Sequence, residues 1–113
     1  MAYSDPLDER NRAAKRRHYH ANKQQYLDRN IAAKAARRVW LHEQKDVPCT
    51  DCGRRYPYYV MQFDHLDPTQ KLMTVSRLVL WSWRRLKAEV AKCEVVCANC
   101  HAERTHQRRL AQL

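Results

Sequence analysis

The stretch Cys97-Ala98-Asn99-Cys100-His101 places two thiols at metal-ligand spacing, with an imidazole directly after the second thiol. Two earlier segments support its importance: Cys49-Thr50-Asp51-Cys52-Gly53 holds a second thiol pair, and Phe63-Asp64-His65 sets a carboxylate beside an imidazole. We interpret the thiols as ligands of one metal ion. The imidazole of His101 is then available for a different task, together with the Asp64-His65 pair.

The two Cys-x-x-Cys pairs predict a structural zinc site with Cys49, Cys52, Cys97 and Cys100 as ligands. Four thiolates suit tetrahedral Zn²⁺, and a two-residue gap lets one turn present both sulfurs. The alternative is four unrelated buried cysteines. A zinc ion held in this way would join the start of the first strand to the start of the last helix. Cys93 stands outside both pairs, and we expect an ordinary buried thiol there.

Length and composition indicate one small domain with a thin core. The chain has 113 residues, of which 44% are hydrophobic and 30% charged, and a bound metal often compensates for so little apolar area. The first ten residues have no apolar run and contain three acids, which argues against a secretory signal. No apolar stretch approaches the roughly 20 residues of a membrane span. We therefore expect a cytoplasmic protein whose cysteines stay reduced.

The charge balance points to a polyanionic partner. Lys and Arg number 22 against 12 Asp and Glu, which gives a formal charge of +10, and the basic residues occur in runs. The alternative is a basic surface that only keeps the protein in solution. A membrane surface is less favoured, because no segment pairs basic residues with a broad apolar face.

Residues 1–47 are expected to form a basic helical arm. Ser4-Asp5-Pro6 is typical of a helix start, and the pattern continues to about Gln44 as one helix, or as two with a bend at Asn22 or Asn30. The part near Trp40 is the most apolar and is expected to pack on the remainder of the chain.

Residues 48–113 are expected to form the metal-binding domain, which makes the chain a small α+β protein. Residues 58–63 and 93–96 are predicted strands, and residues 82–92 and 99–110 are predicted helices. Gly53 is expected to take the positive φ of a metal-binding turn. The expected core residues before the first of these helices are Val75, Leu78, Val79, Leu80 and Trp81.

Cys49-x-x-Cys52, Phe63-Asp64-His65 and Cys97-x-x-Cys100-His101 together resemble the HNH endonuclease family, over roughly residues 45 to 110. The resemblance implies a ββα-metal (His-Me finger) core stapled by the zinc site. It also implies one divalent catalytic ion (Mg²⁺, Mn²⁺, Ni²⁺ or Zn²⁺) and a phage or prophage gene expressed in a bacterial host cell.

The resemblance further implies roles for individual residues. Asp64 and His101 would bind the catalytic ion, and His65 would be the general base. His106 would be a third ligand or a phosphate contact. The family's middle Asn has no counterpart just before the second Cys pair, so Asn99 would either replace it or only cap the last helix. A structural alternative is a surface Asp-His pair at a strand end, with His101 packing locally.

The implied function is a metal-dependent DNA endonuclease that nicks or cuts both strands with low sequence specificity and steep salt dependence. Its partners would be double-stranded DNA and phage packaging proteins. The alternative is a non-catalytic zinc-containing nucleic-acid-binding protein, and an RNA target is less favoured because no aromatic stacking platform is evident. The expected phosphate contacts are Arg16, Arg17, Arg37, Arg38, Arg84, Arg85, Arg104 and Arg108.

Overall fold

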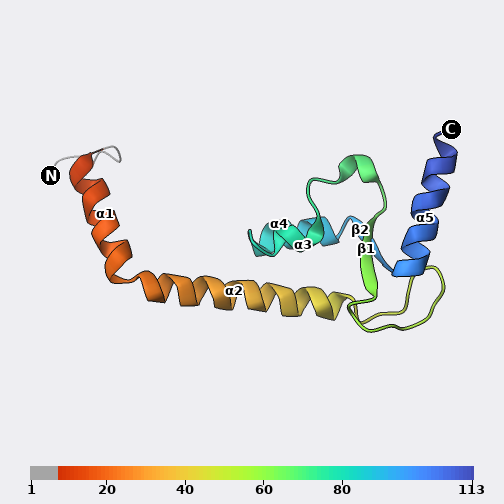
Figure 1. Cartoon of the computed structure of the whole chain (residues 1–113), viewed down its shortest axis with the longest axis horizontal. Coiled ribbons are helices and arrows are strands. Elements are labelled where there is room, and N and C mark those ends of the chain that lie inside the picture. Colours follow the sequence, from red (N-terminus) through yellow and green to blue (C-terminus); the bar gives the residue numbers. More distant parts are fainter. Residues whose placement is uncertain (1–7) are drawn as a thin grey trace. The chain divides into compact units, whose positions relative to one another are not determined.

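The structure is a computed structural model that describes residues 8–113. Within them the chain forms five α-helices, a short 3₁₀ helix and one two-stranded antiparallel sheet, which confirms a small α+β protein (Figure 1). The chain divides into two compact units, Met1–Ala35 and Ala36–Leu113. No helix in the described part combines the length and the apolarity that crossing a bilayer requires.

The first unit is helical and breaks at Asn22. Helix α1 (Glu9–Ala21) begins after Asp8, whose carboxylate accepts a hydrogen bond from the Arg10 amide at 2.8 Å. Asn22 ends α1, and its side-chain amide donates to the His18 carbonyl oxygen at 2.8 Å. Helix α2 (Lys23–Gln44) follows and runs through Asn30. Two helices that separate at Asn22 were one of the expected arrangements, whereas the predicted start at Ser4-Asp5-Pro6 lies outside the described residues.

The sheet pairs β1 (Met61–His65) with β2 (Cys93–Cys97), and its register sets Met61 opposite Cys97. The prediction that the first strand covers residues 58–63 was wrong in its boundaries. Tyr58 and Val60 belong to a turn, in which the Val60 amide donates to the Pro57 carbonyl at 2.9 Å. The strand therefore starts later and includes both Asp64 and His65 as paired residues.

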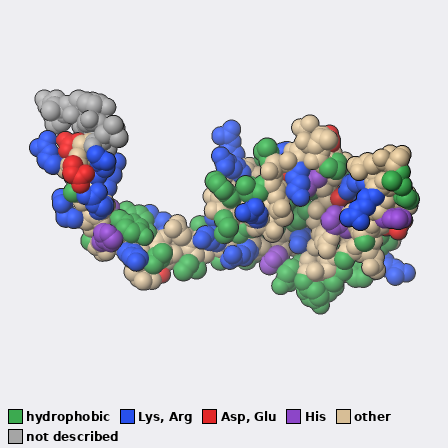
Figure 2. Space-filling view, turned by 45° about the horizontal axis from the view of Figure 1, so that its top comes forward, with side chains coloured by type: hydrophobic (Ala, Val, Ile, Leu, Met, Phe, Trp, Pro, Cys, Tyr) green, Lys and Arg blue, Asp and Glu red, His purple; other side chains and the backbone are tan. Residues whose placement is uncertain are grey.

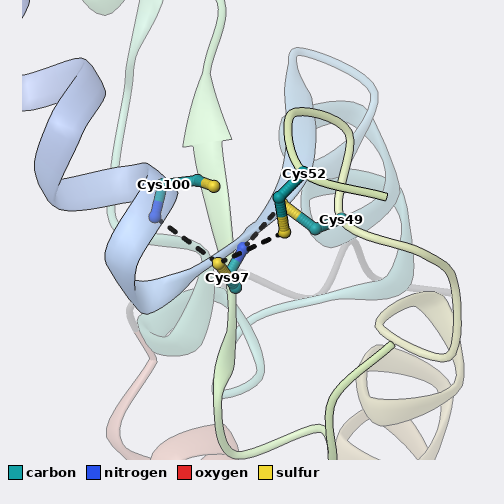
Figure 3. Close-up of side chains that lie close together, drawn as sticks. All are labelled: Cys49, Cys52, Cys97 and Cys100. Carbon is teal, nitrogen blue, oxygen red and sulfur yellow. Dashed lines mark hydrogen bonds between the residues drawn. The ribbon is translucent and has the colours of Figure 1, made fainter. Parts of the chain in front are cut away.

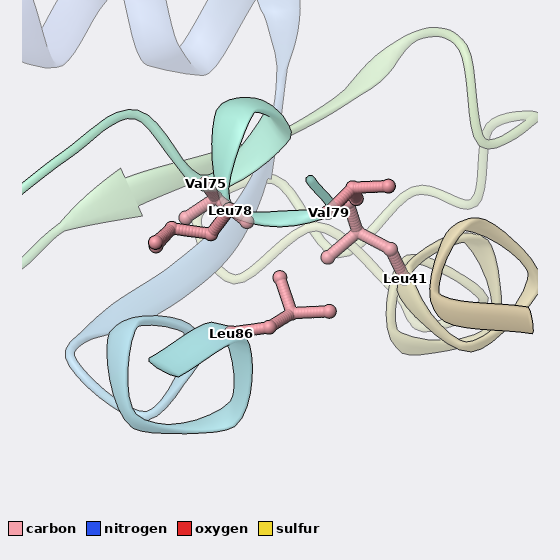
Figure 4. Packing of buried hydrophobic residues seen from close by; sticks show 5 residues of the cluster. All are labelled: Leu41, Val75, Leu78, Val79 and Leu86. Atoms are coloured by element: carbon pink, nitrogen blue, oxygen red, sulfur yellow. The ribbon is translucent and has the colours of Figure 1, made fainter. Parts of the chain in front are cut away.

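Between the strands lie the 3₁₀ helix η1 (Pro68–Gln70) and two helices, α3 (Val75–Leu78) and α4 (Trp83–Val90). Ser82 caps α4, since its hydroxyl accepts from the Arg85 amide at 3.3 Å. The buried apolar cluster that these helices build with the last turns of α2 is shown in Figure 4 and consists of Leu41, Val75, Leu78, Val79 and Leu86.

Two residues of the predicted core are exposed. Leu80 and Trp81 have 54% and 55% of their surface accessible. They follow the single turn of α3 in a tight turn of their own, in which the Trp81 amide donates to the Leu78 carbonyl at 3.0 Å. Val75, Leu78 and Val79 are buried in the cluster with Leu86, so the prediction of core residues was wrong only for Leu80 and Trp81.

Helix α5 (Ala98–Ala111) follows β2 without a linker. Cys97 is both the last strand residue and the helix N-cap, and its sulfur accepts from the Cys100 amide at 3.4 Å. Arg104 and Arg108 of this helix, two of the expected phosphate contacts, are not free surface cations, because both guanidinium groups bind the Asp64 carboxylate of the sheet.

Residues 36–44 of α2 pack within the second unit, as expected for the apolar end of the arm. Leu41 is buried in the cluster of Figure 4. Arg37, an expected phosphate contact, is also buried, and its Nε donates to the Val79 carbonyl at 2.6 Å. This arginine stabilises the turn after α3 and is not a free surface cation in the structure.

Candidate functional site

Four cysteine sulfurs converge from three elements. Cys49 and Cys52 come from the loop before β1, Cys97 ends β2, and Cys100 lies in the first turn of α5 (Figure 3). The four sulfurs lie within 4.8 Å of one another, and those of Cys52 and Cys97 are 4.0 Å apart. Zinc–sulfur bonds of about 2.3 Å in a tetrahedron place sulfurs about 3.8 Å apart. The donor set and its spacing therefore fit a zinc ion.

Backbone geometry brings the first cysteine pair to the second. Gly53 has φ of 74°, which an L side chain rarely adopts, and its amide donates to the Cys49 carbonyl at 2.9 Å. The amide and the hydroxyl of Thr50 both bond the Val95 carbonyl, at 3.0 and 2.8 Å. The bonds of Thr50 fix the loop against β2. The φ of Gly53 confirms the expected positive value.

The surroundings of Cys49 favour its thiolate. Burial by itself would raise the pKa of this thiol, but amide hydrogen bonds from Cys52, Cys97 and Asp51 outweigh burial and lower the pKa to about 6. The Cys97 amide lies 3.3 Å from the Cys49 sulfur. Because metals bind the thiolate and not the thiol, part of the ligand set is prepared for a metal by the backbone alone.

Cys93 takes no part in this cluster. Its thiol donates to the Glu89 carbonyl oxygen at 3.4 Å, and burial, followed by the negative charges of Glu89 and Asp64, raises its pKa to about 11. A protonated, half-buried thiol agrees with the expectation of an ordinary structural cysteine.

Asp64 is 3% exposed and is surrounded by cationic and imidazole groups of α5. Arg108 binds both carboxylate oxygens at 2.7 Å, Arg104 adds a bond of 2.8 Å, and the Nε2 of His101 lies 3.3 Å from Oδ1. Burial would raise the pKa of Asp64, but the hydrogen bonds from Arg108 and Arg104 outweigh it and lower the pKa to about 2. The carboxylate is therefore ionised throughout the physiological range.

Arg104 connects the loop of Cys49 and Cys52 to the Asp64 carboxylate. Its Nε and Nη2 bind the two oxygens of Asp51 at 2.7 and 2.6 Å, while Nη1 reaches Asp64. The sheet register sets Asp64 directly opposite Glu94, a like-charge pair that would weaken the sheet. Arg104 also lies 3.2 Å from Glu94, so one guanidinium compensates three acids.

His65 faces the other side of β1, as the two-residue period of a strand requires. Its Nε2 lies 2.7 Å from an oxygen of Glu89 on α4, and both side chains are buried. Glu89 also accepts from the Lys92 ammonium at 3.0 Å and from the Leu72 amide at 3.1 Å. Within the described residues no hydrogen bond is made by Nδ1 of His65, which leaves that nitrogen available as a proton acceptor.

The structure brings three of the predicted site residues together. Asp64, His65 and His101 line a hollow of about 170 Å³ at the end of β1, into which Lys71 and Arg108 also face. Gln62, two residues before Asp64 on the same strand face, holds Nδ1 of His101 through its side-chain oxygen.

Two predicted residues lie outside this hollow. Asn99 and His106 are both exposed on α5, and neither side chain makes a hydrogen bond or ion pair within residues 8–113. The Asn99 side chain therefore makes no hydrogen bond that would brace the loop behind His65, as the family's middle Asn would.

Glu89 was missed by the sequence analysis, although one signal pointed to it. It lies three residues after the fully buried Leu86, so it falls on the core-facing stripe of its helix. A carboxylate at such a position is rare unless it is paired, and here its partner is the predicted general base.

Comparisons of the chain with protein-family models, with curated proteins and with solved structures give no match.

Proposed function

We propose that the chain is a metal-dependent DNA endonuclease of the HNH type, with residues 61–65 and 93–111 as its ββα-metal core. The proposal is carried by one observation: Oδ1 of Asp64 and Nε2 of His101 approach to 3.3 Å at the wall of a hollow that His65 also lines. These are the three residues to which the sequence resemblance gives the catalytic roles.

The Asp64–His101 pair fits two adjacent positions of a divalent ion. Bonds of about 2.1 Å to an octahedral ion place neighbouring donors about 3.0 Å apart. Among the described residues only the four cysteines form a cluster of three or more metal-binding side chains, so the second ion would take two protein ligands. Mg²⁺, Mn²⁺, Ni²⁺ or Zn²⁺ bound there would supply positive charge to a phosphate group.

His65 is suited to remove a proton from water. Donation of its Nε2–H to Glu89 holds the ring in one tautomer and turns Nδ1 into the basic nitrogen. A water molecule in the hollow would lose its proton to Nδ1 and attack phosphorus as hydroxide, which breaks the bond from phosphorus to the 3′ oxygen. The departing 3′ oxygen would take its proton from solvent water. Lys71 lines the same hollow and would attract the phosphate.

The surface cations would hold the DNA. Figure 2 shows Lys and Arg side chains on each of the two units. Of the predicted contacts, the exposed ones are Arg16, Arg17, Arg38, Arg84 and Arg85. Such contacts read phosphate and not base sequence, so we expect low sequence specificity.

A second candidate function is a non-catalytic zinc-containing nucleic-acid-binding protein. The bonds from Arg104 and Arg108 to Asp64 favour it, because a carboxylate held by two guanidinium groups is also a sound structural ion-pair network. The cysteine cluster and the surface cations serve both functions.

Cleavage of supercoiled plasmid separates the two. We expect the zinc-loaded protein to nick or linearise plasmid when Mg²⁺, Mn²⁺ or Ni²⁺ is added, and His65→Ala to lose this activity while retaining DNA binding. His20→Ala, which replaces an exposed histidine of α1, is the matched control and should cleave normally. Equal nicking by wild type and His65→Ala would reveal a contaminating nuclease, and binding without cleavage would favour the second function.

A further inference from the structure

The three tryptophans of the chain lie at or beside the start of α4. Trp40 and Trp83 meet edge to face with ring centres 6.0 Å apart, and Trp81 stands just before the helix. Trp81 and Trp83 keep 55% and 39% of their surface exposed. Large rings are usually withdrawn from water, so two exposed indoles separated by one residue mark a surface that can receive a partner.

Cationic side chains lie against these rings. The guanidinium of Arg85 is 5.2 Å from the Trp81 ring centre, and the ammonium of Lys87 is 5.2 Å from that of Trp83. The neighbouring Arg84 is exposed as well. The sequence from Trp81 to Ala88 contains no acid, so every charged residue in this stretch is a cation.

A hollow of about 430 Å³ lies beside the same helix. Leu72, Met73 and Leu78 give it apolar walls. Its charged lining consists of Arg84, Arg85, Lys92 and one acid, Glu89. Arg85 thus belongs to both features, since it covers one face of Trp81 and borders the hollow.

We propose that this surface binds an unpaired single strand of nucleic acid, with bases stacked on Trp81 and Trp83 and phosphates bound by Arg84, Arg85 and Lys87. Aromatic rings interleaved with cations match the alternating flat apolar bases and charged phosphates of such a strand. In a duplex the base faces are already stacked, and the centre of a protein–protein interface is depleted of charged groups. The exposed Trp81 supplies the stacking platform that the sequence pattern did not reveal.

This inference deepens the proposed endonuclease function, because it makes unpaired nucleotides near the cleavage site part of the preferred substrate. It does not depend on catalysis, since the binding surface and the hollow of His65 are formed by different residues.

Intrinsic fluorescence tests the proposal, because all tryptophans of the chain report on this surface. A short oligothymidylate should quench the emission of the zinc-loaded protein without added divalent ion. Trp81→Ala should weaken binding, followed by fluorescence anisotropy of a labelled oligothymidylate, about tenfold, as expected for the loss of one stacked base. Trp81→Phe should restore most of the affinity, and a blunt-ended duplex without unpaired nucleotides should bind wild type and Trp81→Ala equally.

Two control variants define the outcomes. Leu80→Ala removes an equally exposed apolar side chain that precedes Trp81 in the sequence, and Tyr59→Ala removes a 73% exposed ring elsewhere in the second unit. Both variants should bind oligothymidylate normally. Unchanged oligothymidylate binding by Trp81→Ala would overturn the proposal. An equally large loss of affinity in Leu80→Ala would also overturn it, and would favour an apolar protein-docking surface. If Trp81→Ala does not fold, Arg85→Gln provides the same test. Plasmid cleavage is measured separately, so loss of one function does not hide the other.

Discussion

Glu89 is an ionised side chain in the apolar interior, and its three hydrogen bonds offset the cost of burying its charge. Burial would raise its pKa, but hydrogen bonds from Lys92, His65 and the Leu72 amide outweigh burial and lower it. A buried carboxylate with this set of donors holds each of them in place. Glu89 is therefore a positioning residue for His65 in the proposed reaction, and it also stabilises the fold.

Replacing Glu89 with Leu should cost about 3 kcal/mol in the free energy of unfolding, because the buried ring N–H of His65 loses its acceptor and the Lys92 ammonium loses its ion-pair partner. Glu89→Gln should cost less, since its amide oxygen still accepts the His65 N–H. Urea unfolding of the zinc-loaded protein measures both.

The exposed Glu103 on α5 provides the control, and Glu103→Gln should leave stability unchanged within about 0.5 kcal/mol. Among variants that fold, Glu89→Leu should lower the kcat of plasmid cleavage and change KM less. Glu89→Gln should have a kcat between those of Glu89→Leu and the wild type. A wild-type kcat in both Glu89→Leu and Glu89→Gln would show that Glu89 does not orient His65.

Arg104→Lys should destabilise the second unit by about 2 kcal/mol, because a single ammonium cannot replace a planar fork that binds Asp51 and Asp64 at once. Thermal unfolding measures the loss. Arg109→Lys, at an exposed position of the same helix, should leave the melting temperature unchanged. Similar melting temperatures for the two variants would mean that the three acids do not need this guanidinium.

At the scale of elements, the loop before β1 depends on the backbone of Gly53. A Cβ at this position would meet no heavy atom within 4 Å, so a substitution there is opposed by the positive φ alone. Gly53→Ala should therefore weaken zinc binding by about 1–2 kcal/mol, the cost of a left-handed L-residue. Competition with a chromogenic chelator gives the affinity.

Asn tolerates positive φ better than Ala, which makes Gly53→Asn the matched comparison. It should retain more of the zinc affinity than Gly53→Ala. The reverse order would show that the loop does not require this backbone conformation for metal binding.

The elements whose ends carry a local signal could be predicted from the sequence. Ser82 and Asn22 mark helix ends through side-chain hydrogen bonds to nearby backbone, and the two cysteine pairs mark where the chain must converge. The exposure of Trp81 had no such signal. It depends on the size of the buried cluster around Leu86, which does not extend to Trp81. The start of β1 was misplaced because Tyr58 and Tyr59 favour strands by composition, while the turn after Pro57 prevents their pairing.

The candidate site was predictable as a set of residue types but not as a set of contacts. The Asp64–His101 approach was expected, since the first follows the cysteine loop and the second follows the last cysteine. The pairing of Arg104 and Arg108 with Asp64 depends on the rotation of α5 against the sheet. No periodicity in the sequence fixes that rotation.

For the whole molecule, the second unit has a thin core, so its stability should depend on zinc. Cys97→Ser should lose the metal and the fixed environment of the tryptophans, because structural zinc affinity is part of the folding free energy. Cys93→Ser is the matched control outside the cluster and should keep one zinc per chain. Native mass spectrometry and near-ultraviolet circular dichroism report the two properties. Retention of zinc by the Cys97→Ser variant would exclude Cys97 as a zinc ligand.

The first unit should contribute charge to nucleic-acid binding without contributing to the stability of the second. Arg16→Gln with Arg17→Gln should reduce the slope of log affinity against log salt by up to about 2, since each phosphate contact contributes about 0.9. The melting temperature should not change. The uncharged double variant Gln24→Ala with Gln25→Ala should keep the wild-type slope, and equal slopes in all three proteins would exclude these arginines as phosphate contacts.

The register that sets Met61 opposite Cys97 has a further consequence for folding. A slip of one residue in a strand turns every side chain to the opposite face, which would remove Asp64 from α5 and displace Cys97 from the other sulfurs. Four-sulfur coordination is then available only to the correctly aligned sheet. A bound zinc ion would therefore stabilise the one alignment that also assembles the polar residues around Asp64, and misaligned chains would lack a complete set of ligands.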